Sequence, residues 1–253
     1  METTFAELYS QPHIVRQFDF AKLELTEGEF LRSLMRRPKP VHLLDLGIGA
    51  GRTTRFFAPL VEHYVGIDIA PGMIKRCRET FATHQQNDGW AFSVGDAADL
   101  SAHANASFHA ALFSFNGLDC LPLDQREPCL REIHRVLHPG GTLLFSAHNI
   151  GAIPHLYHQE SAELSSSRLA AIRARNKTLP ANAPPPFLSF WDGVYGEDVD
   201  LRHIYADPPA QCRQLIEIGF TTVDVLSSTT GEIIEPADLS TARDLSLYYR
   251  CSC

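Results

Sequence analysis

The sequence predicts an α/β protein built on a doubly wound, mostly parallel sheet. Short apolar runs alternate with amphipathic stretches between residues 41 and 149, as in repeated strand–helix units. A glycine-rich turn directly follows the first of these runs. The alternation stops after residue 149 and returns only near residue 201, so a domain of this kind with one insertion suits the 253 residues.

Residues 1–40 are expected to form a helical segment that covers the start of the domain. Apolar side chains at helical spacing, from about Phe18 to Leu34, predict one helix there. Pro38 and Pro40 are expected to end it. We therefore expect these residues to lie on the sheet as a lid segment rather than to join it.

Residues 41–149 carry the alternating pattern itself. Buried runs that end at glycine or at a polar residue predict parallel strands, and the amphipathic stretches between them predict helices. The expected strands are Val41–Leu46, Tyr64–Ile69, Ala91–Val94, Phe108–Phe115 and Thr142–Ala147. The expected helices are Arg52–Leu60, Gly72–Phe81, a short one after Asp96, and Asp124–Leu137.

Residues 150–200 lose both periodicities and are expected to form an irregular insertion. The insertion carries large aromatic side chains (Phe187, Phe190, Trp191 and Tyr195). Because it leaves the carboxyl end of the fifth expected strand, it should begin on the side of the sheet where ligands bind. Residues 201–253 are expected to complete the sheet with strands Leu201–Tyr205, Phe220–Leu226 and Leu245–Arg250 and helix Pro208–Ile218.

Composition excludes several classes of partner. A formal net charge of −8, with 12 histidines counted as neutral, disfavours binding to nucleic acid or to an anionic membrane. There is neither a leader-like start nor an apolar run of the roughly 20 residues that span a bilayer. The six scattered cysteines suit reduced thiols, and we expect a cytoplasmic protein.

The strongest motif is a buried strand that runs into a glycine-rich turn and then a helix. It reads Asp45-Leu-Gly47-Ile-Gly49-Ala-Gly51-Arg52. Glycines let the backbone pass close beneath a ligand, and the helix start offers free N–H groups. Asp68 ends the next strand, where a ribose would present its hydroxyls. The arrangement predicts a nucleoside cofactor.

This motif resembles motif I of the class I S-adenosylmethionine-dependent methyltransferases of the small-molecule type. Four further segments resemble motifs of the same family: Tyr64–Asp68, Val94–Ala97, Phe113–Asp119 and Leu130–Gly141. The resemblance implies a Rossmann-like, mostly parallel seven-stranded sheet. It also implies S-adenosylmethionine as cofactor and S-adenosylhomocysteine as product.

The resemblance also implies which residues hold the cofactor. The loop with Gly47, Gly49 and Gly51 would lie beneath the methionine part, and Asp45 would orient that loop or the amino group. Asp68 would bind the ribose. The adenine would meet the remaining candidates: Asp96, Ala97, Ile69 and Met73.

There are four further cofactor candidates. Tyr9 and Arg16 belong to a stretch that in similar enzymes folds over the cofactor. Phe115 belongs to the motif next to the reactive methyl group. Arg52 is a candidate for the methionine carboxylate, with an exposed helix residue as the alternative.

The acceptor side is predicted from position. His148 directly follows the fifth strand and is the candidate general base, since methyl transfer needs a base only when the acceptor must lose a proton. Oxygen and nitrogen acceptors are favoured, on a small molecule. The candidate substrate residues are Asn116, Asp119, His155, Tyr157, His158, Trp191, His203 and Tyr205.

Alternatives remain at this point. The aromatic insertion could anchor itself to the domain or form a homodimer contact instead of binding an acceptor. The chain could be a regulator that binds the cofactor without methyl transfer, or a nicotinamide enzyme, although the glycine spacing disfavours the latter. No metal site is expected. Histidines stand four apart at 134/138 and three apart at 155/158, but the first pair lies on a helix far from the donor methyl and lacks a nearby third ligand. The terminal pair Cys251 and Cys253 would need outside help to bind a metal.

Overall fold

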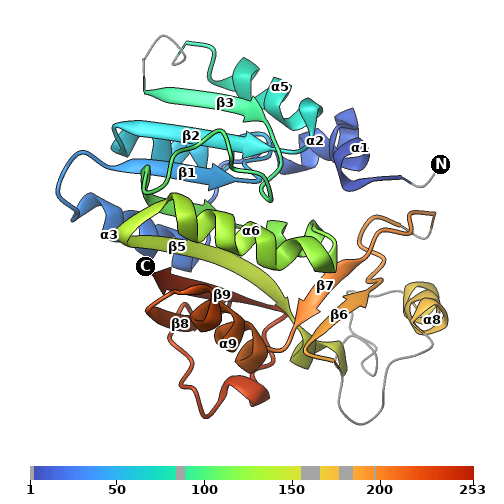
Figure 1. Ribbon diagram of the computed structural model, residues 1–253. Helices are drawn as coiled ribbons and strands as arrows, with labels where there is room; N and C mark the ends of the chain where they lie inside the picture. Colours follow the sequence, from blue (N-terminus) through green and yellow to red (C-terminus); the bar gives the residue numbers. More distant parts are fainter. Residues whose placement is uncertain (1–2, 84–88, 155–165, 177–184, 197) are drawn as a thin grey trace.

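One mixed sheet runs through the protein (Figure 1). The computed structural model describes residues 3–83, 89–154, 166–176, 185–196 and 198–253. The strands are β1 (His42–Leu46), β2 (His63–Asp68), β3 (Trp90–Val94), β4 (Phe108–Phe113), β5 (Leu137–Asn149), β6 (Phe187–Phe190), β7 (His203–Ala206), β8 (Thr222–Ser227) and β9 (Ser246–Ser252). The nine strands exceed the implied seven because a hairpin of β6 and β7 adds to the sheet.

The strand order confirms the doubly wound class. β3, β2, β1, β4 and β5 are neighbours in that order, and all their pairings are parallel. β5 is shared by three strands: β4, the antiparallel β9, and β7, which pairs in parallel only at His148 and Asn149. β8 lies beyond β9. The carboxyl ends of the parallel strands therefore meet at one edge, where ligands of such sheets bind.

Helices cover both faces of the sheet (Figure 1). The side chains of Leu44 and Leu46 enter one core, with α6 (Leu123–Val136) and α9 (Pro208–Ile218). Leu43 enters the other core, with α3 (Leu25–Met35), α4 (Thr54–Phe57) and α5 (Pro71–Thr80). Successive strand residues point to opposite faces, so β1 is buried on both sides, as its continuous apolar run predicts.

The N-terminal segment differs from the single expected helix. It contains α1 (Phe5–Tyr9) and α2 (Pro12–Phe18) before α3. Phe18 ends a helix instead of beginning one, and the chain restarts at a capping box formed by Glu24 and Glu27. The expected helix Arg52–Leu60 is reduced to α4 and a 3₁₀ turn, because Pro59 interrupts it.

Two further boundaries are corrected. The expected helix after Asp96 is wrong: the Asp96 carboxylate accepts the N–H of Ala98 at 2.9 Å and holds a turn instead. β4 ends at Phe113, two residues early, because Phe115 and Asn116 adopt left-handed backbone angles, with φ of 55° and 59°.

The insertion is more regular than the sequence indicates. It contains α8 (Ser166–Arg175) and β6, and β6 pairs antiparallel with β7. Trp191, Phe190 and Tyr205 form a small core with Ile150, Ile153 and Ile172. The insertion is therefore continuous with the main sheet. No helix in the described part of the chain is long and apolar enough to cross a membrane.

Candidate active site

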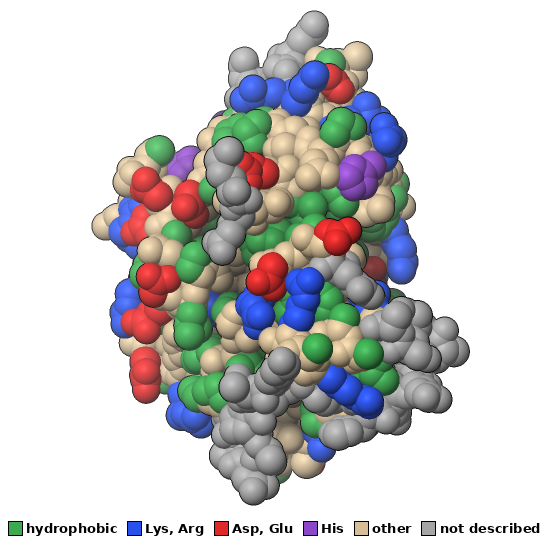
Figure 2. All heavy atoms as spheres, turned by 90° about the vertical axis from the view of Figure 1, so that its right-hand side faces the viewer, with side chains coloured by type: hydrophobic (Ala, Val, Ile, Leu, Met, Phe, Trp, Pro, Cys, Tyr) green, Lys and Arg blue, Asp and Glu red, His purple; other side chains and the backbone are tan. Residues whose placement is uncertain are grey.

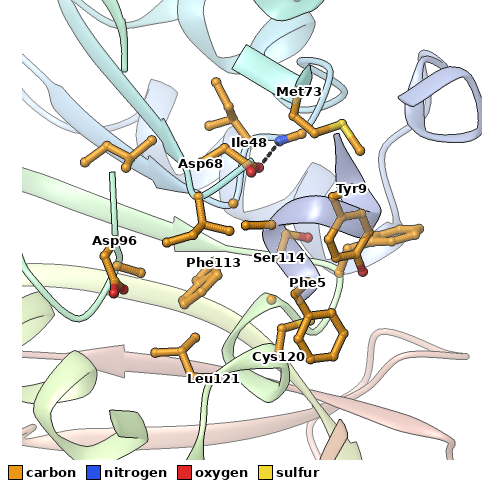
Figure 3. A pocket seen from close by; sticks show the side chains of 18 of the residues that line it. Phe5, Tyr9, Ile48, Asp68, Met73, Asp96, Phe113, Ser114, Cys120 and Leu121 are labelled. Atoms are coloured by element: carbon orange, nitrogen blue, oxygen red, sulfur yellow. Dashed lines mark hydrogen bonds between the residues drawn. The ribbon is translucent and has the colours of Figure 1, made fainter. Parts of the chain in front are cut away.

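A cavity of about 670 Å³ lies at the carboxyl edge of the sheet, where β1 to β4 end (Figure 3). This volume is within the usual range of small-molecule sites, roughly 300–1,000 Å³. The glycine loop forms one wall, and Thr3–Tyr9 with parts of β6 and β7 form another. Its lining includes these predicted cofactor residues: Asp45, Gly47, Gly49, Arg52, Asp68, Ile69, Met73, Asp96, Ala97, Phe115 and Tyr9.

The cavity explains several exposed hydrophobic side chains. Ile69, Phe115 and Leu123 are 45%, 46% and 50% exposed, and all three line it. Figure 2 shows the face that carries the N-terminus, where hydrophobic side chains are exposed among charged ones. Exposed apolar side chains gathered in a concave site are typical of ligand binding.

The glycine loop owes its shape to left-handed backbone angles. Gly47, Gly49 and Gly51 have φ of 63°, 56° and 91°, and only glycine adopts such angles without strain. Gly51 does not line the cavity, since a Cβ there would overlap the ring of Phe81. Gly51 therefore packs the loop against its support, while Gly47 and Gly49 face the cavity.

Asp68 fixes the same loop from the end of β2. Its two carboxylate oxygens accept the backbone N–H groups of Gly49 and Ala70, both at 2.8 Å (Figure 3). Burial raises the pKa of Asp68, and the two backbone hydrogen bonds oppose that rise. Each oxygen keeps a second lone pair, and Asp68 lines the cavity, which suits a pair of hydroxyl donors from a ligand.

Asp45 offers a buried acceptor without a partner. One carboxylate oxygen accepts the hydroxyls of Thr53, at 2.6 Å, and of Tyr64. The other oxygen, Oδ1, is buried and has no hydrogen bond. Burial raises the pKa of Asp45 to about 7 despite these two hydrogen bonds. An unpaired carboxylate oxygen in a cavity wall suits a cationic ligand group.

Arg52 is buried, so the alternative of an exposed helix residue is wrong. Glu27 binds its guanidinium through two hydrogen bonds of 2.6 and 2.7 Å, and the carbonyl of Lys22 and the hydroxyl of Ser114 accept two more. Burial alone would raise the pKa of Glu27, but Arg52 brings it below its usual value. With these donors occupied, Arg52 presents its Nε and its planar face, which lies 4.4 Å from the ring centre of Phe115.

The N-terminal segment closes the cavity from the other side. Phe5 and Tyr9 line it, and the Tyr9 hydroxyl is hydrogen-bonded to that of Tyr195 from the insertion. Arg16, by contrast, lies on an exposed face of α2 and does not line the cavity. Only one of the two N-terminal candidates thus reaches the site, because helical spacing places the other outward.

His148, the candidate base, does not line the cavity. Its Nδ1 is hydrogen-bonded to Asp119 at 2.9 Å, and its Nε2 lies 3.2 Å from the amide nitrogen of Asn116. Asp119 is fully buried and also pairs with Arg126 at 2.6 Å. Both ring nitrogens of His148 are therefore occupied. Asn116 and Asp119, expected to touch substrate, instead brace the loop after β4.

The aromatic candidates of the insertion are buried rather than cavity-lining. Trp191 and Tyr205 are 0% and 1% exposed, and neither they nor His203 line the cavity. His203 pairs with Asp192 at 2.7 Å. Burial alone would lower the pKa of His203, but the hydrogen bond to Asp192 raises it to about 10. The alternative that these aromatics anchor the insertion accounts for their positions.

The remaining histidine and tyrosine candidates either lie outside the described residues or do not form a common site. His155, Tyr157 and His158 lie outside the described residues. In the pair 134/138, His134 packs edge-on against Phe220, whereas His138 stacks on His109. The two imidazoles thus have separate partners.

Several residues that shape the site were missed from the sequence. Glu27 and Ser114 hold Arg52, and Cys120, Arg202 and Ser189 line the cavity. Apart from Ser114, which falls within the segment Phe113–Asp119, none belongs to a motif. Only the pairing of distant segments brings them together, so sequence spacing carries no signal for them.

Taken together, the glycine loop, Asp68 and the orphaned Oδ1 of Asp45 fit a nucleoside that carries a cationic amino group. The fold and the site therefore define a Rossmann-like enzyme with a nucleoside cofactor. Comparison with known proteins specifies the class further.

Residues 43–141 match the family model of a methyltransferase domain. The malonyl-[acyl-carrier protein] O-methyltransferase of Pseudescherichia vulneris is 27% identical over 204 residues, which are 79% of this chain and 73% of that protein. The carboxy-S-adenosyl-L-methionine synthase of Alteromonas mediterranea is 28% identical over 48% of this chain and 49% of that protein.

Solved structures agree on the fold. An S-adenosylmethionine-dependent methyltransferase from Mesorhizobium loti superimposes with a TM-score of 0.60 at 18% identity, covering 90% of this chain and 98% of that one. A methyltransferase from Aquifex aeolicus gives 0.56 at 13% identity, covering 96% and 98%.

The chain is a class I S-adenosylmethionine-dependent methyltransferase. Its methyl donor is S-adenosylmethionine, and its product is S-adenosylhomocysteine. The alternatives of a nicotinamide enzyme and of a regulator without methyl transfer give way to this class.

Proposed function

We propose that the cavity holds S-adenosylmethionine along the glycine loop, with its methyl group directed towards Phe115 and the wall formed by β6 and β7. Asp68 accepts the ribose hydroxyls, and Asp45 accepts the amino group through its free Oδ1. Asp96 and Ala97 bind the adenine edge. Apolar contact with the ring comes from Ile69 and Met73, which also line the cavity.

Asp68→Ala should weaken S-adenosylhomocysteine binding at least tenfold. A charge-assisted hydrogen bond to a buried carboxylate contributes roughly 1.5–3 kcal/mol, and the variant also frees the N–H of Gly49. Isothermal titration of the folded variant measures the change. Asp99→Ala is the control, since Asp99 is exposed and lies outside the cavity lining. Equal affinity in both variants would remove Asp68 from the site.

Cofactor affinity should rise with pH through about 7, the pKa of Asp45 in the cofactor-free protein. Below this pH the carboxyl is protonated and must lose its proton to bind an ammonium group, so affinity should fall up to about tenfold per unit. Isothermal titration with S-adenosylhomocysteine between about pH 5.5 and about pH 8.5, roughly 1.5 units either side of the pKa of Asp45, measures this dependence. Asp45→Asn should flatten the profile, and an unchanged slope in that variant would contradict the assignment.

The acceptor is proposed to be a carboxylate oxygen of a small molecule or of a carrier-bound acyl group. Among the described residues that line the cavity there is no histidine, and a carboxylate is already deprotonated, so its methylation needs no base. Arg202, which lines the cavity beside Ile204 of β7, would face the acceptor. Its contacts with the exposed Asp200, at 3.7 Å, and with the carbonyl oxygen of Arg175, at 3.5 Å, are both long, so a carboxylate ligand would compete well for the guanidinium.

The relatives support an oxygen acceptor. The curated malonyl-[acyl-carrier protein] O-methyltransferases act, as their name says, on an oxygen of a malonyl group. A nitrogen acceptor remains the second candidate from the sequence, but an amine would arrive protonated and would need a base in the cavity wall. We therefore place the O-methyl ester first.

Catalysis would rest on alignment and exclusion of water. S-Adenosylmethionine supplies an electrophilic methyl group on a sulfonium centre. The chain's part is to hold the acceptor oxygen in line with that methyl group and to keep the site dry. Phe5 and Tyr9 of the N-terminal segment, which we propose acts as a lid, and Phe115 supply the apolar walls.

The proposal is tested by supplying labelled S-adenosylmethionine with three sets of acceptors: dicarboxylic monothioesters, phenols and primary amines. We expect alkali-labile methyl esters from the first set only. Arg202→Gln should raise KM for that acceptor about tenfold with little change in kcat, because uniform binding is lost. Arg36→Gln, at an exposed position outside the cavity lining, is the control. Alkali-stable products from amines or phenols alone would overturn the carboxylate assignment.

A further inference from the structure

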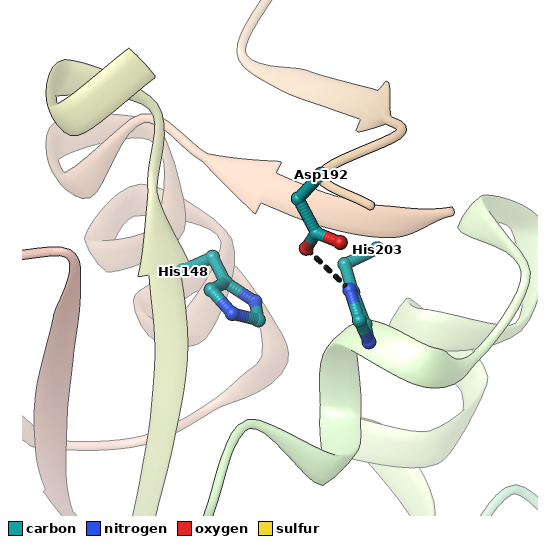
Figure 4. A group of neighbouring side chains, drawn as sticks. All are labelled: His148, Asp192 and His203. Carbon is teal, nitrogen blue, oxygen red and sulfur yellow. Dashed lines mark hydrogen bonds and ion pairs between the residues drawn. The ribbon is translucent and has the colours of Figure 1, made fainter. Parts of the chain in front are cut away.

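Three side chains that can bind a metal ion lie together near the wall formed by β6 and β7. The proposed methyl transfer does not use them. One ligating atom each from His148, Asp192 and His203 lies within 4.8 Å of the others (Figure 4). Their side chains are 11%, 6% and 5% exposed. We propose that these three residues bind a divalent first-row transition ion, with Zn²⁺ as the best match.

Strand pairing holds the two histidines in place, and a short turn after β6 holds Asp192. His148 is the penultimate residue of β5 and pairs in register with Tyr205 of β7. His203 begins β7, and its partner in β6 is Phe190. Asp192 follows two residues later, and its Oδ1 accepts the N–H of Val194 at 3.0 Å. Ligands fixed by strand pairing lose little freedom on binding an ion.

A second layer orients the ligands. Asp119 accepts a hydrogen bond from Nδ1 of His148 at 2.9 Å and is itself held by Arg126 at 2.6 Å. Histidines that bind metals commonly donate one ring N–H to a carboxylate in this way, which leaves the other nitrogen as ligand. The hydrogen bond of 3.2 Å that Nε2 receives from Asn116 is the contact that an ion would replace.

The charges also suit a cation. Arg126 already neutralises Asp119, so Asp192 is the buried carboxylate left to the two imidazoles, and it lies 2.7 Å from His203. A buried ion pair stabilises a protein little by itself. A bound ion replaces the protons that such ligands share when metal-free. Two imidazoles and a carboxylate are ligands that Zn²⁺ prefers over Mg²⁺ or Ca²⁺.

The position assigns a bracing role to the ion rather than a catalytic one. None of the three ligands lines the cavity, but Arg202 and Ile204, the neighbours of His203, do. The ion would tie the hairpin of β6 and β7 to the end of β5. Its loss should therefore weaken folding while leaving the cofactor contacts intact. The inference does not depend on the identity of the acceptor.

The test uses the full chain, purified, stripped with a chelator and titrated with Zn²⁺. We expect one ion per chain and a rise in Tm of roughly 5–10 °C at a hundredfold excess over Kd. S-Adenosylhomocysteine affinity should be the same before and after. Co²⁺ in place of Zn²⁺ should give the visible absorption of a low-symmetry site.

Variants distinguish ion binding at this site from ion binding by other thiols and histidines of the chain. Asp192→Asn and His203→Gln should lose the ion and the rise in Tm, while His134→Gln and Cys253→Ser should keep both. The chelator experiment on the unmodified protein stands even if a variant fails to fold. An unchanged Tm with Zn²⁺, or full stoichiometry in folded Asp192→Asn and His203→Gln, would overturn the proposal.

Discussion

Gly49→Val should abolish cofactor binding, by a hundredfold or more, while the protein stays folded. Gly49 lines the cavity with φ of 56°, and a Cβ there meets only the sulfur of Met73, at 4.0 Å. The added side chain therefore finds room in the free protein but occupies space along the loop that we assign to the cofactor. Left-handed backbone angles cost a non-glycine residue roughly 1–2 kcal/mol, which a folded domain tolerates.

Gly140→Val is the matched control for this experiment. Gly140 also has a positive φ, 73°, and no atom lies within 4 Å of a Cβ built there, but it is outside the cavity lining. Both variants thus carry the same kind of backbone strain. Circular dichroism should show both folded, and isothermal titration with S-adenosylhomocysteine should show binding in Gly140→Val alone. Binding by both would mean that the loop does not approach the ligand.

Glu27→Ala should lower the free energy of unfolding by about 3–5 kcal/mol, the cost of leaving one member of a buried ion pair alone. The side chains of Glu27 and Arg52 are 0% and 8% exposed. Glu27 also accepts hydrogen bonds from Ser114 and Tyr248, which would lose their partner. Denaturant unfolding measures the change, and cofactor affinity should fall with it because Arg52 lines the cavity.

Two comparisons isolate the effect of burial. Glu127→Ala removes half of an exposed pair with Arg131, whose side chains are 48% and 54% exposed, and should cost less than about 1 kcal/mol. The double variant Glu27→Leu, Arg52→Met should recover most of the stability, since no buried charge is left alone. A loss in Glu27→Ala no larger than in Glu127→Ala would show that the pair contributes little.

The sequence predicts the cofactor half of the protein well because its signals are local. The hydrophobic periodicity of short segments predicts the order of the strands. The spacing of residues close in sequence predicts the glycine loop up to Gly51 and the acidic residue at the end of β2. The structure confirms the doubly wound fold, and it brings Asp45, Asp68 and Asp96 to one cavity as expected. Boundaries failed where side chains capped or interrupted a helix, as at Phe18 and Pro59.

The acceptor half could not be predicted in the same way. His148 was expected directly after a strand that ends at Ala147, but β5 continues to Asn149 and includes it. The environment of His148 depends on Asp119 and Asn116, which come from the loop after β4. Likewise, the aromatic residues of the insertion indicate that Trp191 is buried, but they do not show whether it packs in a core or lines a ligand pocket. Only tertiary packing decides which side of such a residue faces a ligand.

The pairing of β7 with β5 bears on how ligands enter and leave. The wall built from β6 and β7 pairs with the central sheet at His148 and Asn149, so we expect its paired amides to exchange with solvent more slowly than those of α1 and α2. The N-terminal segment is held to that wall by the hydroxyl contact of Tyr9 with Tyr195 and by the ring of Phe5 beside His203, at 5.4 Å. Local opening of α1 and α2, rather than movement of the insertion, would then admit the acceptor and release S-adenosylhomocysteine.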